Sequence, residues 1–207
     1  MKIFAVGMNY ATHNKELHHS LDLSEPVIFM KADSVLKDGK PFFIPDFSDE
    51  VHYETEIVIK ICRLGKNIDE RFAPRYYDEV TVGIDFTARD RQRELRDKGL
   101  PWELSKAFDH SAAVGEFVPL NTLGDIQQLA FRLDKNGQTV QQANTCSMLF
   151  SIPRIVAYVS RFFTLRMGDL IYTGTPAGVG PVRIGDLPRE PEGTRLLCTL
   201  KTRKKKV

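Results

Sequence analysis

Three carboxylates are placed where they would crowd together in an apolar part of the chain. Residues 51–61 read as a β-strand, and residues two apart on a strand share a face, so Glu54 and Glu56 project together. Asp85 follows a second strand-like run, 79–84. Carboxylates that repel one another are stabilised by a divalent cation, and all-oxygen ligands favour Mg²⁺, Mn²⁺ or Ca²⁺ over zinc. The alternative is an ordinary solvated strand face.

A cluster of substrate-binding groups is suggested by the residues that follow Asp85. Asp85, Arg89 and Gln92 are spaced i, i+4 and i+7, which predicts one face of a helix within the polar segment 87–96. A guanidinium group is the natural partner of a substrate carboxylate. The competing interpretation is a surface helix that is simply rich in arginine.

Lys106 is flanked by apolar and small residues and could offset the charge of the carboxylates or of a developing enolate. The competing interpretation is a surface lysine. His13 and Glu16 are three residues apart, so a helix would place them on one face. A carboxylate beside an imidazole orients it and raises its basicity, as a general base for water requires. A histidine cluster for metal, with His18 and His19, and a solvated polar helix remain alternatives.

The glycine-rich segment 174–180 offers close backbone approach to a ligand and a hydroxyl group at Thr175. It matches neither the P-loop pattern nor the dinucleotide-binding fingerprint. A plain turn explains the segment equally well.

Strand patterns dominate the chain, and helices are few. Asn136-Gly137 between alternating residues predicts a hairpin over 129–140, and Ser151 with Pro153 predicts the start of an apolar-striped helix. The remaining expected strands are 1–7, a buried 27–30, 169–173 and 196–201. We expect a single mixed α/β domain over 1–207 that is mainly β rather than a doubly wound sheet.

The overall composition excludes several classes of function. The 207 residues carry a net charge of +2, which argues against a dedicated nucleic-acid-binding protein, and the basic run 201–206 is expected to be a solvated tail. No stretch approaches the length needed to span a bilayer. Three widely spaced cysteines suggest free thiols in a reducing compartment. We therefore expect a soluble cytoplasmic protein.

Taken in order, these motifs resemble the fumarylacetoacetate hydrolase family, and most closely its small, acylpyruvase-like members. The matching segments, which run over essentially the whole chain, are 6–16, 26–31, 52–56, 85–92, 98–102 with Lys106, 147–153, 168–169 and 173–180. The resemblance implies a β-roll or β-sandwich fold with few short helices, and a homodimer. Two departures are Met8, where an arginine often precedes Asn-Tyr, and Ala32, where a proline often follows the lysine.

The resemblance also implies roles for individual residues. It implies that Mg²⁺ or Mn²⁺ is held by the three carboxylates, with Ca²⁺ able to replace it in a crystal. Lys106 would be the active-site lysine, and the substrate-contacting positions would be Arg89, Gln92 and Thr175. The water-activating pair His13 and Glu16 would be carried on a lid segment of about residues 9–22.

The function expected from these residues is metal-dependent cleavage of a C–C bond in a 2,4-dioxo acid, an acylpyruvate, through a metal-bound pyruvate enolate. The site would favour a small 2-oxo acid as substrate. Oxaloacetate decarboxylation passes through the same enolate, and isomerisation or tautomerisation of an unsaturated 2-oxo-diacid needs only a proton transfer. A binding module that kept the scaffold is the alternative without catalysis.

Overall fold

The computed structural model describes residues 1–16, 24–37, 39–186 and the short segment 201–204. Its largest sheet runs in the order β2-β1-β13-β6-β7-β9-β3, and β10 also pairs with β7. The strands of this sheet are β1 (Ile3–Gly7), β2 (Val27–Lys31), β3 (Leu36–Lys37), β6 (Thr55–Ile61), β7 (Tyr77–Asp85), β9 (Ala112–Val114), β10 (Val118–Pro119) and β13 (Leu170–Tyr172). Strands far apart in the sequence therefore meet at its centre.

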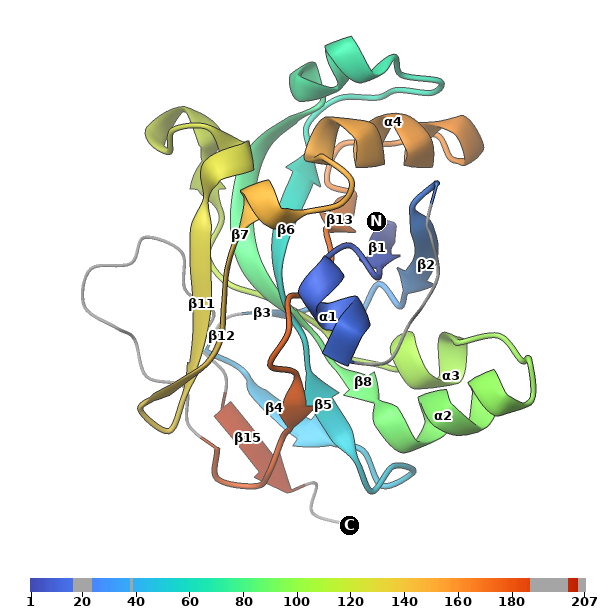
Figure 1. Cartoon of the computed structure of the whole chain (residues 1–207), viewed down its shortest axis with the longest axis vertical. Coiled ribbons are helices and arrows are strands. Elements are labelled where there is room, and N and C mark those ends of the chain that lie inside the picture. The colour runs from blue at the N-terminus through green and yellow to red at the C-terminus, as the bar shows by residue number, and fades with distance from the viewer. Residues whose placement is uncertain (17–23, 38, 187–200, 205–207) are drawn as a thin grey trace.

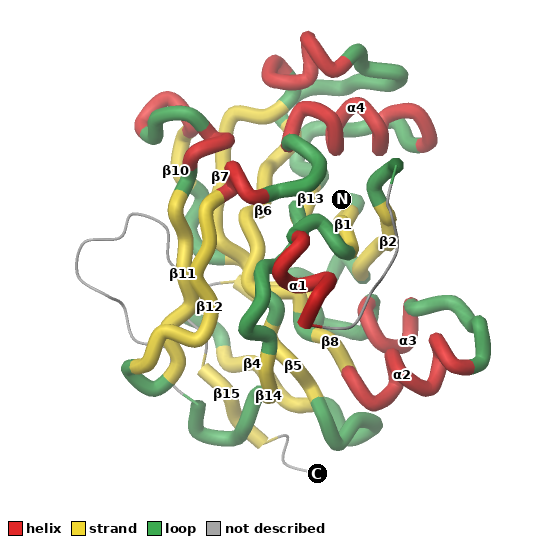
Figure 2. Tube along the Cα trace, in the orientation of Figure 1, coloured by secondary structure: helices red, strands yellow, loops and turns green. Residues whose placement is uncertain are grey.

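Three smaller sheets accompany the large one, with β11 and β12 on its left side in Figure 1 and β4, β5 and β15 towards the lower end. They are the three-stranded β14-β5-β8, the hairpin of β11 and β12, and the parallel pair β4 and β15. Their strands are β4 (Pro41–Ile44), β5 (Val51–Tyr53), β8 (Thr87–Ala88), β11 (Ala130–Lys135), β12 (Gln138–Asn144), β14 (Gly180–Pro181) and β15 (Lys201–Lys204). Strands make up most of the described regular structure, as Figure 2 shows. The expectation of a mainly β fold is confirmed.

The helices are short and lie outside the sheets. They are α1 (Ala11–Glu16), α2 (Arg89–Asp97), α3 (Glu103–Lys106) and α4 (Ile152–Phe162), with 3-10 turns η1 (Glu70–Arg75), η2 (Leu120–Thr122), η3 (Ile126–Gln128) and η4 (Thr145–Ser147). In Figure 1, α4 lies towards one end of the molecule, α2 and α3 lie towards the other, and α1 appears between them. None of the helices in the described part of the chain is long and apolar enough to cross a membrane.

The largest hydrophobic cluster lies between the sheet and α4. Helix α4 begins where expected, because the Ser151 hydroxyl accepts a hydrogen bond from the Arg154 N–H and Pro153 needs no such partner. Its buried face, which includes Ile155 and Val159, packs with Ile57 and Ile59 of β6. The helical apolar spacing thus belongs to the core, as the sequence predicts.

Several predicted boundaries differ from the structure. The strand expected over 51–61 is interrupted at Glu54, because β5 belongs to the small sheet and β6 to the large one. The strand at 27–30 is half-buried rather than buried. The hairpin turn is as predicted, with φ of 54° at Asn136 and 82° at Gly137.

At the C-terminal end, residues 196–200 of the expected last strand lie outside the described residues, as do 205–207. Residues 201–204 pair in parallel with β4, so this part of the basic run is not a free tail. The difference arises because β4 presents an edge with which the backbone can pair.

Candidate active site

The three predicted carboxylates meet at the junction of the large and small sheets. Glu54 lies between β5 and β6, Glu56 lies on β6, and Asp85 ends the neighbouring strand β7. One oxygen atom from each carboxylate lies within 4.8 Å of those from the other two. All three residues are buried. The Asp85 N–H donates to the Glu54 carbonyl at 2.8 Å, so the end of β7 is hydrogen-bonded to the residue between β5 and β6.

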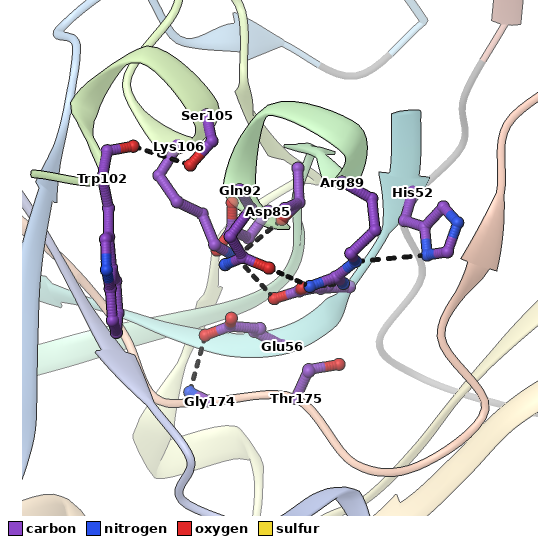
Figure 3. A network of polar contacts seen from close by, with 12 residues as sticks. His52, Glu56, Asp85, Arg89, Gln92, Trp102, Ser105, Lys106, Gly174 and Thr175 are labelled. Atoms are coloured by element: carbon purple, nitrogen blue, oxygen red, sulfur yellow. Dashed lines mark hydrogen bonds and ion pairs between the residues drawn. The ribbon is translucent and has the colours of Figure 1, made fainter. Parts of the chain in front are cut away.

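Three buried cations surround these carboxylates. The Lys106 ammonium donates to Glu54 and to Asp85, both at 2.8 Å, and to the Thr87 hydroxyl at 2.6 Å. The Arg89 guanidinium donates to the other Glu54 oxygen at 2.5 Å. Figure 3 shows Lys106 and Arg89 converging on the cluster from different elements. Lys106 is therefore not the surface lysine of the competing interpretation.

Lys31 is the third cation, and sequence reasoning did not assign it a role. Its fully buried ammonium donates to Asp85 at 2.5 Å and also to the Lys106 carbonyl oxygen. Burial lowers the pKa of Lys31, and Asp85 only partly opposes this effect. The one signal in the sequence is a lysine that ends an apolar strand, where a buried charge needs a partner.

The electrostatic environment differs between Glu54 and Glu56. Burial alone would raise the pKa of Glu54, but Lys106 and Arg89 together hold it below its usual value. Burial raises the pKa of Glu56 well above its usual value, and the Asp85 and Glu54 charges raise it further. Glu56 accepts a hydrogen bond of 2.6 Å from the Gly174 N–H, which opposes the shift without cancelling it. A nearby divalent cation would favour the ionised form of Glu56.

The donor set fits a hard divalent ion. Three converging carboxylates supply only oxygen ligands, as Mg²⁺ and Mn²⁺ prefer, and the neighbouring buried cations keep the group from carrying a large net negative charge. Among the described residues, Glu54, Glu56 and Asp85 form the group of three Asp, Glu, His or Cys side chains whose ligand atoms lie close enough to share one metal ion.

The predicted helical face of Asp85, Arg89 and Gln92 is partly wrong. Asp85 ends β7, two residues form β8, and α2 begins only at Arg89. Arg89 and Gln92 do share a buried face of α2, and Arg89 donates to the Gln92 side-chain oxygen at 2.5 Å. Both residues line the same cavity as Glu54 and Glu56, and Asp85 is connected to that cavity through Lys106.

Thr175 lines the cavity from the loop after β13. Its hydroxyl donates to the Thr55 carbonyl at 2.9 Å and accepts from the Gln141 side chain at 2.9 Å. Gln141 also accepts from the Thr55 N–H at 2.9 Å, so this residue of β12 organises the loop; no motif in the sequence pointed to it. Gly174, with φ of 102°, has no room for a Cβ atom beside Asn9.

His13 and Glu16 lie on α1 and face each other, with 3.4 Å between the His13 Nδ1 and a Glu16 oxygen. Glu16 also accepts from the Gly178 N–H, at 3.1 Å to each carboxylate oxygen, so the pair is connected to the 174–180 loop. His13 is buried and lines the cavity. The pair therefore has the geometry that a general base and its orienting carboxylate require.

Glu16 raises the pKa of His13, as expected, but the net shift of that pKa is downward. Burial lowers the pKa of His13, and the opposing effects of Glu54 and Glu16 are smaller. The imidazole is consequently neutral at neutral pH, which is the form that accepts a proton. The neighbouring His18 and His19 lie outside the described residues, as does most of the second half of the expected lid segment.

A cavity brings all these groups together. His13, Glu54, Glu56, Arg89, Gln92, Lys106 and Thr175 line it, together with Val6, Met8, Phe29, Arg96 and Trp102. Two predicted site residues, Glu16 and Asp85, do not line the cavity. Glu16 contacts His13 and Asp85 contacts Lys106, and both of these partners line it. The arrangement can bind a small anion, hold a metal beside it and move a proton.

Comparison with known proteins connects this site to named enzymes. Residues 2–200 match the family model described as fumarylacetoacetate (FAA) hydrolase C-terminal. The mitochondrial oxaloacetate tautomerase of Mus musculus is 43% identical over 185 residues, which cover 89% of this chain and 83% of the relative. The mitochondrial oxaloacetate decarboxylase of Dictyostelium discoideum is 40% identical, with 90% and 86% covered.

A solved structure shares the whole fold. The fumarylpyruvate hydrolase of Pseudomonas aeruginosa, in complex with Mn²⁺ and pyruvate, superposes with a TM-score of 0.89 at 34% identity, covering 99% of this chain and 90% of that one. The expected fold class is thereby confirmed. The expectation of an enzyme rather than a binding module agrees with the names of all three relatives.

Proposed function

Because the chain belongs to the fumarylacetoacetate hydrolase family, we propose that it enolises a small 2-oxo acid at a divalent metal held by Glu54, Glu56 and Asp85. One observation carries this proposal: three buried carboxylates converge within 4.8 Å beside a lysine that contacts two of them. Mn²⁺ in the complex of the Pseudomonas relative supports this class of ion, and we propose Mg²⁺ as the alternative.

The ion would act as a Lewis acid on the 2-oxo group. The Arg89 guanidinium and the Gln92 amide on the α2 side of the cavity would bind and orient the substrate carboxylate. Lys106, buried beside the carboxylates, would stabilise the negative charge that develops on the enolate oxygen. The neutral His13 imidazole, oriented by Glu16, would accept the proton that the reaction removes.

Two outcomes of this chemistry are supported by different observations. The names of the curated relatives favour tautomerisation or decarboxylation of oxaloacetate, in which the enolate is formed by proton transfer or by loss of CO₂. The His13–Glu16 pair favours hydrolysis of an acylpyruvate. In that reaction His13 takes a proton from water, the hydroxide attacks the distal carbonyl, and the C–C bond breaks to give a carboxylic acid and the pyruvate enolate, which is then protonated.

The expected homodimer, the cytoplasmic location and the lack of nucleic-acid binding remain part of the proposal. Near-neutral net charge supports the last of these. Two of the relatives compared above are named as mitochondrial, so location can differ among related enzymes.

A single assay separates the outcomes. Purified protein loaded with Mn²⁺ is given acetylpyruvate, oxaloacetate and an unsaturated 2-oxo-diacid in parallel, and the products are identified by NMR. Acetate with pyruvate indicates hydrolysis, and CO₂ with pyruvate indicates decarboxylation. A shifted double bond indicates isomerisation, and a faster approach of oxaloacetate to its keto–enol equilibrium indicates tautomerisation. Failure to accelerate any of the three, with metal bound, would refute the proposed function.

A further inference from the structure

The cavity has two unlike sides. Arg89, Gln92 and Arg96 line it from α2, whereas Val6, Met8, Phe29 and Trp102 line it from β1, β2 and the segments beside β1 and α3. In Figure 3, Trp102 and Arg89 lie on opposite sides of Glu56 and Asp85. A substrate whose carboxylate binds on the α2 side would therefore extend its other end towards the apolar side.

The apolar side is closely packed. The rings of Phe29 and Trp102 lie with their centroids 6.0 Å apart, and a Cβ atom on Gly7 would already touch both rings. The Lys106 ammonium lies 5.1 Å from the Phe29 ring centroid, next to this side. That ammonium already contacts Glu54, Asp85 and Thr87. This side consequently offers little to balance a second negative charge on the substrate.

Met8 is held at this apolar side by an unusual backbone conformation. Its φ of 62° lies in the left-handed region, which is uncommon and unfavourable for a residue with a side chain. The Asn14 side chain donates to the Met8 carbonyl at 3.0 Å. The next residue, Asn9, donates to the carbonyls of Phe150 and Thr173. Such a conformation persists only where the surroundings enforce it, so the position of Met8 at the cavity is fixed by its neighbours.

The buried charges of the site balance a substrate with one carboxylate. Glu54, Glu56 and Asp85 are matched by Lys31, Arg89 and Lys106, so the six buried groups sum to zero when all are ionised. The charge of a divalent ion is then cancelled by the enolate of a monocarboxylic 2-oxo acid, which carries two negative charges. The oxaloacetate enolate carries three. Arg96, which lines the cavity from α2, is exposed, so solvent and salt screen its charge.

We propose that Met8 and the apolar side select 2-oxo acids whose far end is uncharged, such as acylpyruvates with a neutral acyl group, over dicarboxylates such as oxaloacetate. This inference rests on the proposed function and chooses between its two outcomes. It assigns to Met8 a specificity-determining role: the residue there decides whether a second carboxylate finds a partner.

The kinetic test compares the wild-type protein with Met8→Arg and with Met8→Leu as the uncharged control. The measured quantity is kcat/KM for oxaloacetate divided by kcat/KM for acetylpyruvate, with Mn²⁺ saturating. Met8→Arg should raise this ratio at least tenfold, because an arginine can pair with the second carboxylate. Met8→Leu should leave the ratio within about twofold, and circular dichroism melts verify that each variant folds.

A binding test removes catalysis from the comparison. Malate and 2-hydroxybutanoate both offer a carboxylate and a hydroxyl to a metal, but only malate carries a second carboxylate. Calorimetric titration of each into the Mn²⁺-loaded proteins should show wild type binding 2-hydroxybutanoate at least as tightly as malate. Met8→Arg should shift the affinity ratio at least tenfold towards malate.

The outcomes separate this inference from the proposed function. If the wild-type protein, with Mn²⁺ bound, accelerates the reaction of neither oxaloacetate nor acetylpyruvate nor the unsaturated 2-oxo-diacid, the proposed function fails. If both substrates react but wild type prefers oxaloacetate, or if Met8→Arg leaves the kinetic and binding ratios unchanged, the proposed function stands and the role assigned to Met8 is overturned.

Discussion

The carboxylate cluster and the His13–Glu16 pair are built in contrasting ways. The cluster lies at the start of β6 and the end of β7, two long paired strands at the centre of the large sheet. Three buried cations hold Glu54 and Asp85, and the Gly174 N–H holds Glu56. The pair lies on the six-residue helix α1. Glu16 connects it to the loop 174–180 by accepting a hydrogen bond from the Gly178 N–H. Helices this short have little stability of their own.

This difference suggests a division between binding and the choice of reaction. A metal site in the sheet core is constrained by everything packed around it, so it supports the chemistry shared by related enzymes. A base on a short peripheral helix can be changed, oriented or moved without disturbing the core. Substitutions in the two regions should therefore affect metal binding and turnover separately.

The largest effect is expected for Asp85→Asn. Removing one of three anionic ligands should lower Mn²⁺ affinity more than the about 10–100-fold that outer-shell changes typically cost, with turnover lost as well. Isothermal titration calorimetry measures the affinity. Glu79→Gln on the same strand, where the carboxylate pairs with half-exposed Lys60, is the matched control and should bind Mn²⁺ normally. Undiminished affinity in Asp85→Asn would remove Asp85 from the metal site.

His13→Ala should separate the two regions most clearly. Mn²⁺ affinity should stay within about twofold of wild type, while hydrolysis of acetylpyruvate should fall by at least about 100-fold through loss of the general base. Stopped assays of acetate release, beside calorimetry, measure both quantities. His110→Ala, which changes an exposed histidine, serves as the control. Wild-type hydrolysis by His13→Ala would exclude His13 as the base.

Gly83→Ala tests how tightly the core constrains the cluster. Gly83 pairs with Glu56 across β6 and β7, and a Cβ atom there would lie 2.6 Å from Val58 and 2.7 Å from the Ala113 carbonyl. We expect about 1–3 kcal/mol lower free energy of unfolding in urea titrations. Gly124→Ala, where a Cβ atom meets nothing within 4 Å, should be nearly neutral. Equal stability of the two variants would show that the sheet around Glu56 adapts.

The smallest expected effect is a shift in pH dependence. Burial lowers the pKa of His13 while Glu16 raises it, so the acid limb of kcat/KM for hydrolysis should lie below the ordinary histidine value of 6.5. Glu16→Gln removes an effect that favours the protonated form, and should therefore move this limb to still lower pH, besides reducing the plateau rate. pH–rate profiles with Mn²⁺ saturating would show the shift. An acid limb that moves to higher pH would contradict the role given to Glu16.

The local part of the site could be predicted from the sequence, because it follows from short-range periodicity. The period of two on a strand placed Glu54 beside Glu56, and helical spacing placed His13 beside Glu16. The break at Glu54 was not predictable, since residues 51–61 carry no residue that interrupts a strand, and the break depends on which sheet each half joins. The prediction that Asp85 shares a helix with Arg89 and Gln92 was wrong for the same kind of reason, because Asp85 ends β7, a strand of the large sheet.

Contacts between distant parts of the chain carry no local signal. Lys31 reaches Asp85 across 54 residues, and Glu16 reaches Gly178 across 162 residues. Neither partner's flanking sequence indicates the other. The family resemblance supplied the grouping of the predicted residues, but physical reasoning from a single sequence supplies neither Lys31 nor Gln141.

The hydrogen bonds of Thr175 limit what this residue can recognise. Its one hydroxyl proton is donated to the Thr55 carbonyl, and Gln141 occupies one of its lone pairs. The oxygen atom can therefore only accept a further hydrogen bond. A deprotonated oxygen gains nothing from such a neighbour, whereas an enol hydroxyl or a water molecule can donate to it. Thr175 can thus hydrogen-bond a protonated ligand oxygen but not a deprotonated one.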